Sequence, residues 1–332
     1  MEKVIEPVIE FVLSLQEPGG GFPTYESYPI VNPDAGWTRL PDASPFITAN
    51  VLFSLMQLNN TTAVSAAIEK GVQSLLTAKE GIGFWRFWPA NSKQHPVPLD
   101  MDVTCIVLFV LNRCGHTFKS DKILLNNKSA GGYFETWLGP RISMWPFPAV
   151  AFNFLKDYGR TKPTQKLGYF AFNDKEPAVA ANVVLHLGEN KKTQPCIDQI
   201  ISEVKTGDIS KQFYHHDIVV CYHISRAYAN GVQGFKVLGP VIAAKICAYF
   251  NAGNIVDDDM LCAMAANVLL NFNREIELAE KLIIHIASSK SYPDKWTSSS
   301  YFCSKDHNFF SGSPALSAGI FVEACANLNR YK

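Results

Sequence analysis

The stretch Ile47-Thr-Ala-Asn-Val-Leu-Phe-Ser-Leu55 returns in altered form as Val103-Thr-Cys-Ile-Val-Leu-Phe-Val-Leu111. The two segments are identical at five of nine positions, and both are apolar almost throughout. A helix that is apolar on every side is buried, so both segments predict buried helices of one repeated design. Looser matches at four further places bring the expected buried helices to six: Pro177–Leu185, Asp217–Tyr222, Met264–Leu270 and Pro314–Phe321.

Between these segments lie stretches with apolar residues on one face only. In Ala66–Leu76 the apolar residues recur at helical spacing with charged and polar residues between them, which is typical of a helix with one side in water. Six buried helices alternating with six amphipathic ones predict an all-α fold, a single (α/α)6 barrel whose inner helices surround a central apolar cavity. The expected amphipathic helices are Val4–Leu15, Val64–Thr77, a weak one near Lys119–Leu125, Cys196–Val204, Gly239–Phe250 and Glu275–Ala287.

No break in composition divides the 332-residue chain, so we predict one domain over residues 1–332. A segment at about 126–175 is rich in Pro, Gly and aromatic residues, and we expect it to cover one end of the barrel. No convincing alternation of β-branched and polar residues predicts a sheet. Turns at 16–22, 79–85 and 128–134 share a Gln or Lys, a Gly four residues on and an aromatic residue six on. We interpret these turns as structural, with Gly ending the helix before each turn.

Composition excludes several classes of function. The net charge is zero and no basic block occurs, so nucleic acid is not an expected partner. The eight cysteines are scattered without a CxxC pair, which indicates reduced core residues rather than disulfides or a metal site. The first residues lack the features of a signal peptide, and no apolar run is long enough to span a membrane. We therefore expect a cytoplasmic protein with no obligate protein partner, and monotopic membrane contact stays open.

Two aspartates stand directly before an apolar run in Pro96-Val-Pro-Leu-Asp100-Met-Asp102-Val-Thr104. A structural interpretation makes Asp100 the N-cap of a helix and places Asp102 in its first turn, where both carboxylates favour the helix dipole. Alignment of the repeats puts Asp102 opposite Phe46. One helical hairpin therefore has an acid where its best-matching sibling has an aromatic ring. This asymmetry inside a repeat favours a catalytic role for Asp102.

The repeated turns, the alternating helices and Asp100-Met-Asp102-Val-Thr104 resemble the squalene-hopene and class II terpene cyclases, whose acid motif is Asp-x-Asp-Asp-Thr. With length for one helical domain, the chain is most similar to the single-domain meroterpenoid cyclases. The resemblance implies a protonation-initiated cyclase with Asp102 as proton donor, supported by Asp100 and Thr104. Val103 stands where the family has its third acid. The implied partner is a linear polyprenyl or prenylated aromatic molecule, with no cofactor and with Mg²⁺ only for a diphosphate substrate.

Proton transfer to an alkene sets demands on the site. An alkene is a very weak base, so it needs a carboxylic acid that keeps its proton in a dry cavity. His95 and His216 are candidates to orient that acid. Aromatic faces attract the cations that form next, by about 0.5–2 kcal/mol each. The candidates for the cavity wall are Phe46, Phe84, Trp85, Trp88, Tyr133, Phe134, Trp145, Trp296, Tyr301 and Phe302.

Two other functions stay open. Because Val103 departs from the acid motif, the chain also fits a non-catalytic isoprenoid- or lipid-binding barrel. A glycoside-active enzyme would pair Asp102 with Asp217 or Asp259 across the cavity. Binding of a prenyl chain without turnover would identify the first alternative, and polar groups inside the cavity would favour the second. A diphosphate head group would require basic residues at the cavity mouth, for which the candidates are Arg86, Lys93 and Arg141.

Overall fold

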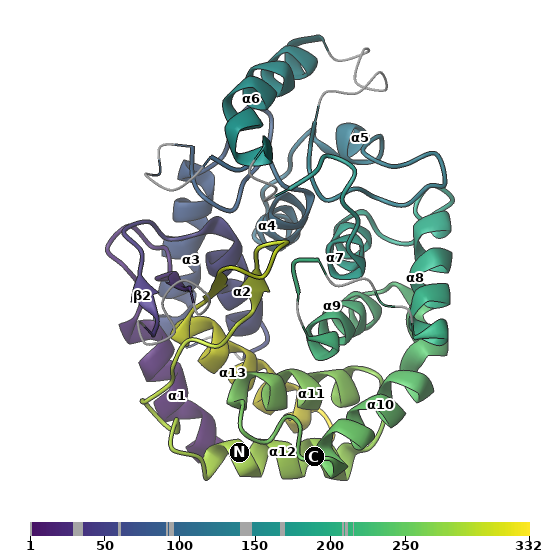
Figure 1. The fold of residues 1–332 in the computed structure, drawn as a ribbon. Coiled ribbons are helices and arrows are strands. Elements are labelled where there is room, and N and C mark those ends of the chain that lie inside the picture. The colour runs from purple at the N-terminus through teal and green to yellow at the C-terminus, as the bar shows by residue number, and fades with distance from the viewer. Residues whose placement is uncertain are drawn as a thin grey trace.

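A computed structural model describes residues 2–28, 36–58, 61–90, 92, 96–139, 148–166, 170–207, 209, 212–214 and 216–332. Six helices form its centre, and each contacts the next in chain order while the last contacts the first, so that the ring closes (Figure 1). These helices are α2 (Pro45–Leu55), α4 (Met101–Arg113), α7 (Pro177–Leu187), α9 (Asp217–Ala229), α11 (Asp259–Asn271) and α13 (Pro314–Asn329). They contain the six segments expected to be buried, and the predicted all-α fold is confirmed.

The inner helices are buried because they are apolar on nearly every side. All eleven residues of α2 are buried. The outer helices lie outside this ring (Figure 1) and bury one face each; α3, for example, buries Val64, Gly71 and Leu75. The outer helices are α1 (Glu2–Ser14), α3 (Thr62–Thr77), the four-residue α5 (Asp121–Leu124), α8 (Gln194–Thr206), α10 (Gly239–Asn251), which follows the 3₁₀ helix Gln233–Leu238, and α12 (Ile276–Ala287).

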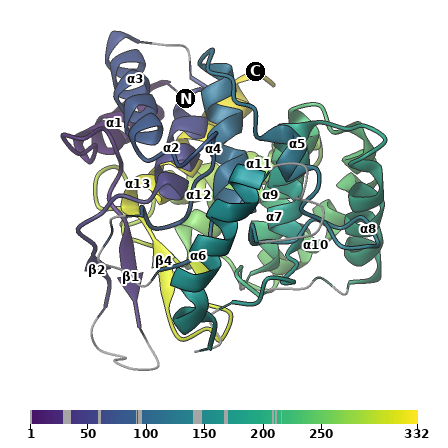
Figure 2. The ribbon, with the colours of Figure 1, turned by 90° about the horizontal axis from the view of Figure 1, so that it is seen from above.

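A small antiparallel sheet lies at one end of the ring, contrary to the expectation of no sheet. Its strands are β1 (Tyr25–Ser27), β2 (Thr38–Arg39), β3 (Phe302–Cys303) and β4 (Phe310–Gly312), in the order β2-β1-β4-β3. Strands of two or three residues are too short to show an alternating pattern. The sheet joins the first turn of the chain to the loop before α13, as β1 and β4 show in Figure 2. It brings Tyr301 and Phe302 over the inner helices.

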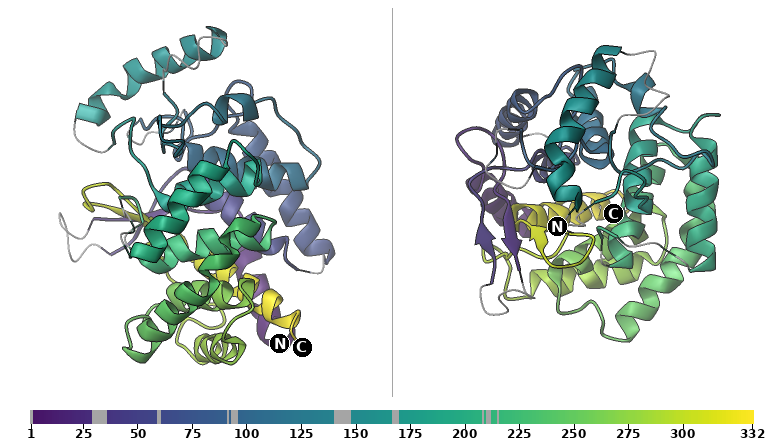
Figure 3. Two further views of the ribbon diagram at one scale, coloured as in Figure 1. Left: turned by 90° about the vertical axis from the view of Figure 1, so that its right-hand side faces the viewer. Right: turned by 45° about the horizontal axis from the view of Figure 1, so that its top comes forward.

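The segment expected to cover one end contains a long helix, α6 (Pro148–Lys166), which projects beyond the ring (Figure 3). Buried Arg86 ties this helix to the turn before α4, because it donates to Asp157 of α6 (2.9 Å), to Glu80 and to the carbonyl of Val97 (2.7 Å). Among the described residues, no helix is both long enough and apolar enough to cross a membrane.

Candidate active site

Asp100 and Asp102 have different roles at the start of α4. Asp100 is the N-cap: its Oδ1 accepts hydrogen bonds from the backbone N–H of Asp102 (2.7 Å) and of Val103 (3.4 Å). Asp102 follows in the first turn of α4, and its side chain does not cap the helix. Both carboxyl groups are buried, and burial, followed by the charge of Asp102, raises the pKa of Asp100 well above its usual value. Asp102 is therefore the acid of the pair that remains for contacts with other elements.

Two side chains from other inner elements hold Asp102. Asn182 of α7 donates its amide N–H to Oδ1 (2.6 Å), and the hydroxyl of Tyr214 donates to Oδ2. Burial raises the pKa of Asp102 to about 6, although the bonds from Tyr214 and Asn182 and the charge of Arg226 act in the opposite direction. A carboxyl group with this pKa holds its proton far more often near neutral pH than an exposed aspartate does.

Thr104 binds the turn before α4. Its hydroxyl accepts from the backbone N–H of Trp85 (3.0 Å) and donates to the carbonyl of the same residue (3.1 Å). The N–H of Asp100 also donates to that carbonyl (3.0 Å). The single hydroxyl proton of Thr104 is thus given to the backbone, and Thr104 acts on Asp102 only by fixing the start of α4.

Tyr214, rather than a histidine, connects the segment before α9 to Asp102. His216 is the N-cap of α9: its Nδ1 accepts from the N–H of Ile218 (3.1 Å), and its ring packs against Tyr249 of α10. The other candidate to orient the acid, His95, lies outside the described residues. Tyr214 lies two residues before His216, and the tyrosine is the residue that bonds to the acid.

Two of the predicted aromatic residues pack on Tyr214, the tyrosine that bonds to Asp102, and two others lie further from the acid. The ring of Tyr214 meets those of Tyr301 (5.9 Å between centroids) and Phe302 (6.0 Å) edge-on. Phe46 packs against Tyr301 (5.6 Å). Trp88 lies beyond Phe302 in a pocket of about 80 Å³. The pocket is apolar apart from a few groups and is lined by Glu26, Tyr28, Trp88, Val97, Trp137, Thr164, Phe170, Phe213, Phe302, Ser304 and Phe309.

Other predicted aromatic residues lie elsewhere. Phe84 packs on Phe154 of α6 (5.5 Å), and the indole of Trp85 donates to a carbonyl of the outer helix α3 (2.7 Å). Trp296 packs on Phe321 of α13 (5.4 Å). Phe134 is buried in the covering segment, whereas Tyr133 lines a separate polar pocket; Trp145 lies outside the described residues.

A buried polar network continues deeper into the ring. The guanidinium of Arg226 donates to Asn50 Oδ1 (2.7 Å), lies 3.9 Å from Glu323 and stacks over the ring of Phe53 (3.5 Å). The hydroxyl of Tyr301 bonds to His223 (2.9 Å). Sequence reasoning missed this network and Asn182. A usable signal was present, since Ala-Asn-Val recurs at 49–51, 181–183 and 266–268, and a polar amide in an otherwise apolar buried helix requires a partner.

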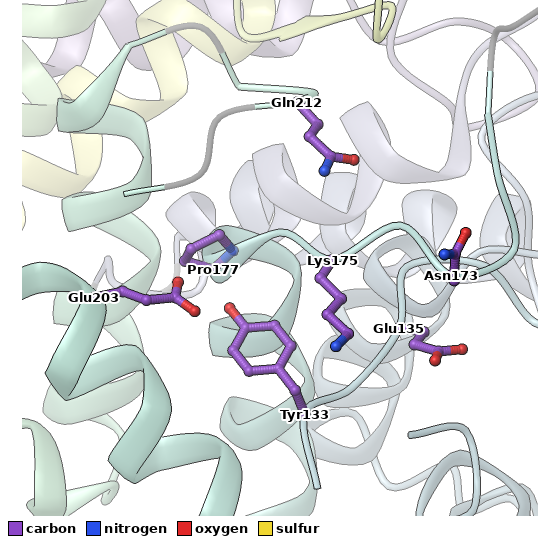
Figure 4. Close-up of a pocket in the computed structure, with 7 residues that line it drawn as sticks. All are labelled: Tyr133, Glu135, Asn173, Lys175, Pro177, Glu203 and Gln212. Atoms are coloured by element: carbon purple, nitrogen blue, oxygen red, sulfur yellow. The ribbon is translucent and has the colours of Figure 1, made fainter. Parts of the chain in front are cut away.

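A polar pocket of about 370 Å³ lies beside the start of α7 (Figure 4). Glu203 of α8 and Tyr133 of the covering segment point toward one another there, and Lys175, at the end of the same segment, and Gln212, from the segment before α9, also line the pocket. The complete lining is Tyr133, Glu135, Asn173, Lys175, Pro177, Glu203 and Gln212. This pocket offers water a polar surface close to the ring.

The two acids that a glycoside-active enzyme could pair with Asp102 are instead bonded to outer elements. Asp217 bonds to Lys245 and to the hydroxyl of Tyr249 (3.0 Å), both on the outer helix α10. Asp259 accepts from Ser289 (2.8 Å), just after α12. Within the described ranges, no group of three His, Cys, Asp or Glu side chains is arranged to hold a metal ion.

Comparison with solved structures identifies the fold. No family model and no curated protein matches the chain in sequence. The type II terpene cyclase MstE from Scytonema, in complex with its substrate geranylgeranyl dihydroxybenzoate, matches with a TM-score of 0.66 and 13% identity, over 100% of this chain and 98% of that chain. A protein from Actinoplanes matches with a TM-score of 0.68 and 16% identity, over 99% of each chain.

The ent-copalyl diphosphate synthase from Streptomyces platensis matches with a TM-score of 0.54 and 14% identity, over 86% of this chain and 50% of that chain. Identities this low speak to the fold alone. The chain has the fold of class II terpene cyclases, and at this level the resemblance seen in the sequence is confirmed.

Proposed function

We propose that this protein is a class II terpene or meroterpenoid cyclase and that Asp102 is its proton donor. The observation that carries the proposal is the buried carboxyl group of Asp102, which does not cap its helix, has a pKa raised to about 6 and is bonded to Tyr214, whose ring packs against Tyr301 and Phe302. Burial keeps the proton on the acid, and a dry site strengthens its action on a weak base. The fold is one that type II terpene cyclases use.

In the proposed reaction, the terminal alkene of a folded prenyl chain takes the proton of Asp102. The O–H bond breaks, and the alkene electron pair forms the new C–H bond and leaves a tertiary cation. Further alkenes of the same chain attack this cation in turn and close the rings. Loss of one proton ends the cascade, so the product is an isomer of the substrate. Tyr301 and Phe302 offer aromatic faces to the cations.

The expected substrate is a prenylated aromatic molecule or another linear prenyl chain without a diphosphate. The substrate bound in the MstE complex, geranylgeranyl dihydroxybenzoate, belongs to the first class. Arg86, one of the basic residues considered for a diphosphate, is buried and already bound to Glu80, Asp157 and a carbonyl. Lys93 and Arg141 lie outside the described residues. We propose no metal or cofactor for the reaction.

The test uses the purified protein in D₂O with geranylgeranyl dihydroxybenzoate and with prenyl alcohols and diphosphates of several lengths. A cyclase gives a cyclic isomer that carries one deuterium at the initiating carbon, detected by mass spectrometry and NMR. Recovery of unlabelled linear substrate from every incubation contradicts the proposal.

A second function, isoprenoid binding without catalysis, is favoured by Val103, which stands where the cyclase motif has its third acid. The aromatic pocket of about 80 Å³ is smaller than the roughly 300–1,000 Å³ of a typical ligand site. A polyprenyl substrate therefore needs more room than this pocket offers beside the stacked rings of Phe213 and Phe302. Tight binding with no product, measured with the same substrates, would identify this second function.

A further inference from the structure

Asp102 must recover a proton after every reaction cycle, and its surroundings restrict the route. This inference rests on the proposed function. Tyr214 donates its hydroxyl to Asp102, and the rings of Tyr301 and Phe302 pack edge-on against Tyr214. Burial raises the pKa of both tyrosine hydroxyls, so neither gives up a proton readily, and a buried acid is a better proton source for Asp102. A second buried acid, placed between Asp102 and water, would provide that route.

Glu176 is such an acid. It is the residue before α7, and its side chain is completely buried. Its Oε2 accepts hydrogen bonds from the backbone N–H of Gln212 (2.7 Å) and of Phe213 (3.3 Å). Its Oε1 is buried and has no hydrogen-bond partner among the residues that the structure describes. A buried carboxyl oxygen without a partner is a place where a proton or a water molecule is expected.

On one side, Glu176 adjoins residues that line the polar pocket. Its chain neighbours Lys175 and Pro177 both line that pocket, and so does Gln212, whose N–H Glu176 binds (Figure 4). The pocket has room for several water molecules at about 370 Å³. Tyr133 also enters it and offers a hydroxyl group. Water can therefore come close to Glu176 without passing the aromatic layer.

On the other side, Glu176 is linked to Asp102 in three ways. The helix that begins after Glu176 carries Asn182, which binds Asp102. The backbone that Glu176 holds runs directly into Tyr214, which binds the other oxygen of Asp102. The charge of Asp102 also acts on Glu176 itself.

The protonation of Glu176 fits a carrier role. Burial raises the pKa of Glu176 to about 8, the two backbone hydrogen bonds lower it, and the negative charges of Asp102 and Glu203 raise it further. Among the described residues, the charged groups around it include Asp102 from α4 and Glu203 from α8, and Lys175 and Glu135 line the pocket that Glu176 adjoins. Near neutral pH, Glu176 holds a proton, whereas Asp102 is an anion after each proton donation.

We propose that Glu176 re-protonates Asp102 in every cycle and then takes a new proton from water in the polar pocket. In this step the O–H bond of Glu176 breaks, and its proton joins the carboxylate of Asp102. The Glu176 carboxylate that remains accepts a proton from solvent. The proton lost at the end of the cascade returns to solvent, so the protons balance over one cycle. Glu176 acts on the substrate only through Asp102.

The deciding variant is Glu176→Gln, because a glutamine carbonyl still accepts from both backbone N–H groups but has no proton to transfer. At pH 6, with enzyme in excess over substrate, we expect a single-turnover rate within about twofold of wild type. In steady state we expect a burst of product followed by turnover at least about tenfold slower, a typical loss for a general acid–base group. Addition of formate or acetate buffer should restore part of the steady-state rate. Glu135→Gln, in the same pocket, should behave as wild type.

Two results would overturn the inference. One is an unchanged steady-state rate in Glu176→Gln, and the other is an equal loss in single-turnover and steady-state rates, which would indicate a structural role only. A measurement without turnover is also decisive. The infrared difference between wild type and Glu176→Gln at pH 7 should show the stretch of a protonated carboxyl group, and an ionised Glu176 contradicts the proposal. Failure of the wild-type protein to cyclise any substrate overturns the proposed function itself.

Discussion

The first turns of α2 and α4 are two versions of one design. In α2 the N-cap Ser44 accepts through Oγ from the N–H of Phe46 (3.2 Å), two residues on. In α4 the N-cap Asp100 accepts through Oδ1 from the N–H of Asp102 (2.7 Å), also two residues on. The structure thus supports the alignment drawn from the sequence, in which Phe46 and Asp102 occupy equivalent positions.

The difference between Phe46 and Asp102 shows which type of residue packing favours at this position of an inner helix. Phe46 packs against Phe87 and Tyr301, as an inner position favours. Asp102 is equally buried, but it needs donors from α7 and from the segment before α9. Burying a carboxyl group lowers stability unless hydrogen bonds compensate. Packing alone therefore favours an apolar residue at position 102, and the acid points to a chemical role.

The largest expected effect comes from removing the acid while keeping its shape. We expect Asp102→Asn to lower the rate of cyclisation by about 1,000-fold or more, because the proton donor is lost. Its Tm should stay level or rise, since an amide carries no charge to bury. Asp258→Asn is the matched control, since Asp258 is the N-cap of α11 and accepts from Leu261 (3.0 Å). It should keep wild-type activity, and a cyclic product from Asp102→Asn would remove Asp102 from its role.

The pH dependence of the rate sharpens the same comparison, because position 102 carries an ionisable group and the equivalent Phe46 does not. Burial sets the pKa of Asp102 at about 6, and only the protonated form donates. The rate should be highest below pH 6 and fall as pH rises through that value, approaching about tenfold per unit. We would measure kcat/KM on both sides of pH 6 with a substrate whose head group does not ionise there. A rate that rises with pH would contradict a general acid.

Sequence reasoning predicted the inner helices well because their signal is strong. A segment such as 103–111 is apolar on every side, and only a buried helix accommodates it. The ring followed from the alternation of such segments with amphipathic ones. The sheet was missed, since strands of two or three residues leave no periodic pattern. Its position depends on pairing between β1 and β4, which are far apart in the sequence.

The candidate site was predictable only in part. Asp102 stood out because the matching repeat has an aromatic residue, Phe46, at the same position. Tyr214 and Asn182 did not, because their role depends on the contact of three inner elements that no local pattern specifies. The aromatic residues show the same limit. Trp85 and Phe302 both belong to aromatic-rich loops, yet Trp85 faces an outer helix and Phe302 lies beside Tyr214.

A smaller effect is expected from removal of the Tyr214 hydroxyl, the hydrogen-bond donor to Asp102 for which the equivalent Phe46 has no need. Tyr214→Phe removes the hydroxyl that bonds to Asp102, so the pKa of Asp102 should rise and the pH midpoint of activity should move upward. Stability should fall by about 1–3 kcal/mol, because a buried oxygen loses its partner. Tyr222→Phe is the matched control, since its hydroxyl binds Glu323 (2.7 Å). Tyr222→Phe should lose similar stability in urea unfolding, but its pH midpoint of activity should stay where it is in wild type. Equal pH midpoints in the two variants would contradict the role of Tyr214.

The pH dependence of stability tests the second buried acid. Glu176 has a pKa of about 8 in the folded protein, above its ordinary value of 4.5. The folded state therefore binds this proton more tightly than the unfolded state. Its contribution is fully present below pH 4.5 and is lost as pH rises through 8, by a few kcal/mol. We would measure the free energy of unfolding in urea between pH 4.5 and pH 8. Over this range the stability of Glu176→Gln should fall less with rising pH than that of wild type. Parallel curves of stability against pH for the two proteins would indicate an ionised Glu176.

The smallest effect is expected where α2 and α4 are alike, at their caps. Loss of an N-cap side chain lowers stability by about 1 kcal/mol, so Ser44→Ala and Asp100→Ala should unfold at similarly reduced urea concentrations. Ser44→Ala should keep its activity, because the first turn of α2 has Phe46 where α4 has the acid. Asp100→Ala should lose activity by up to about tenfold, because the cap fixes the turn that carries Asp102. If both variants lost activity equally, each cap would be needed for the stability of the whole ring. The functional difference between the two first turns would then lie in the side chain of residue 102 alone.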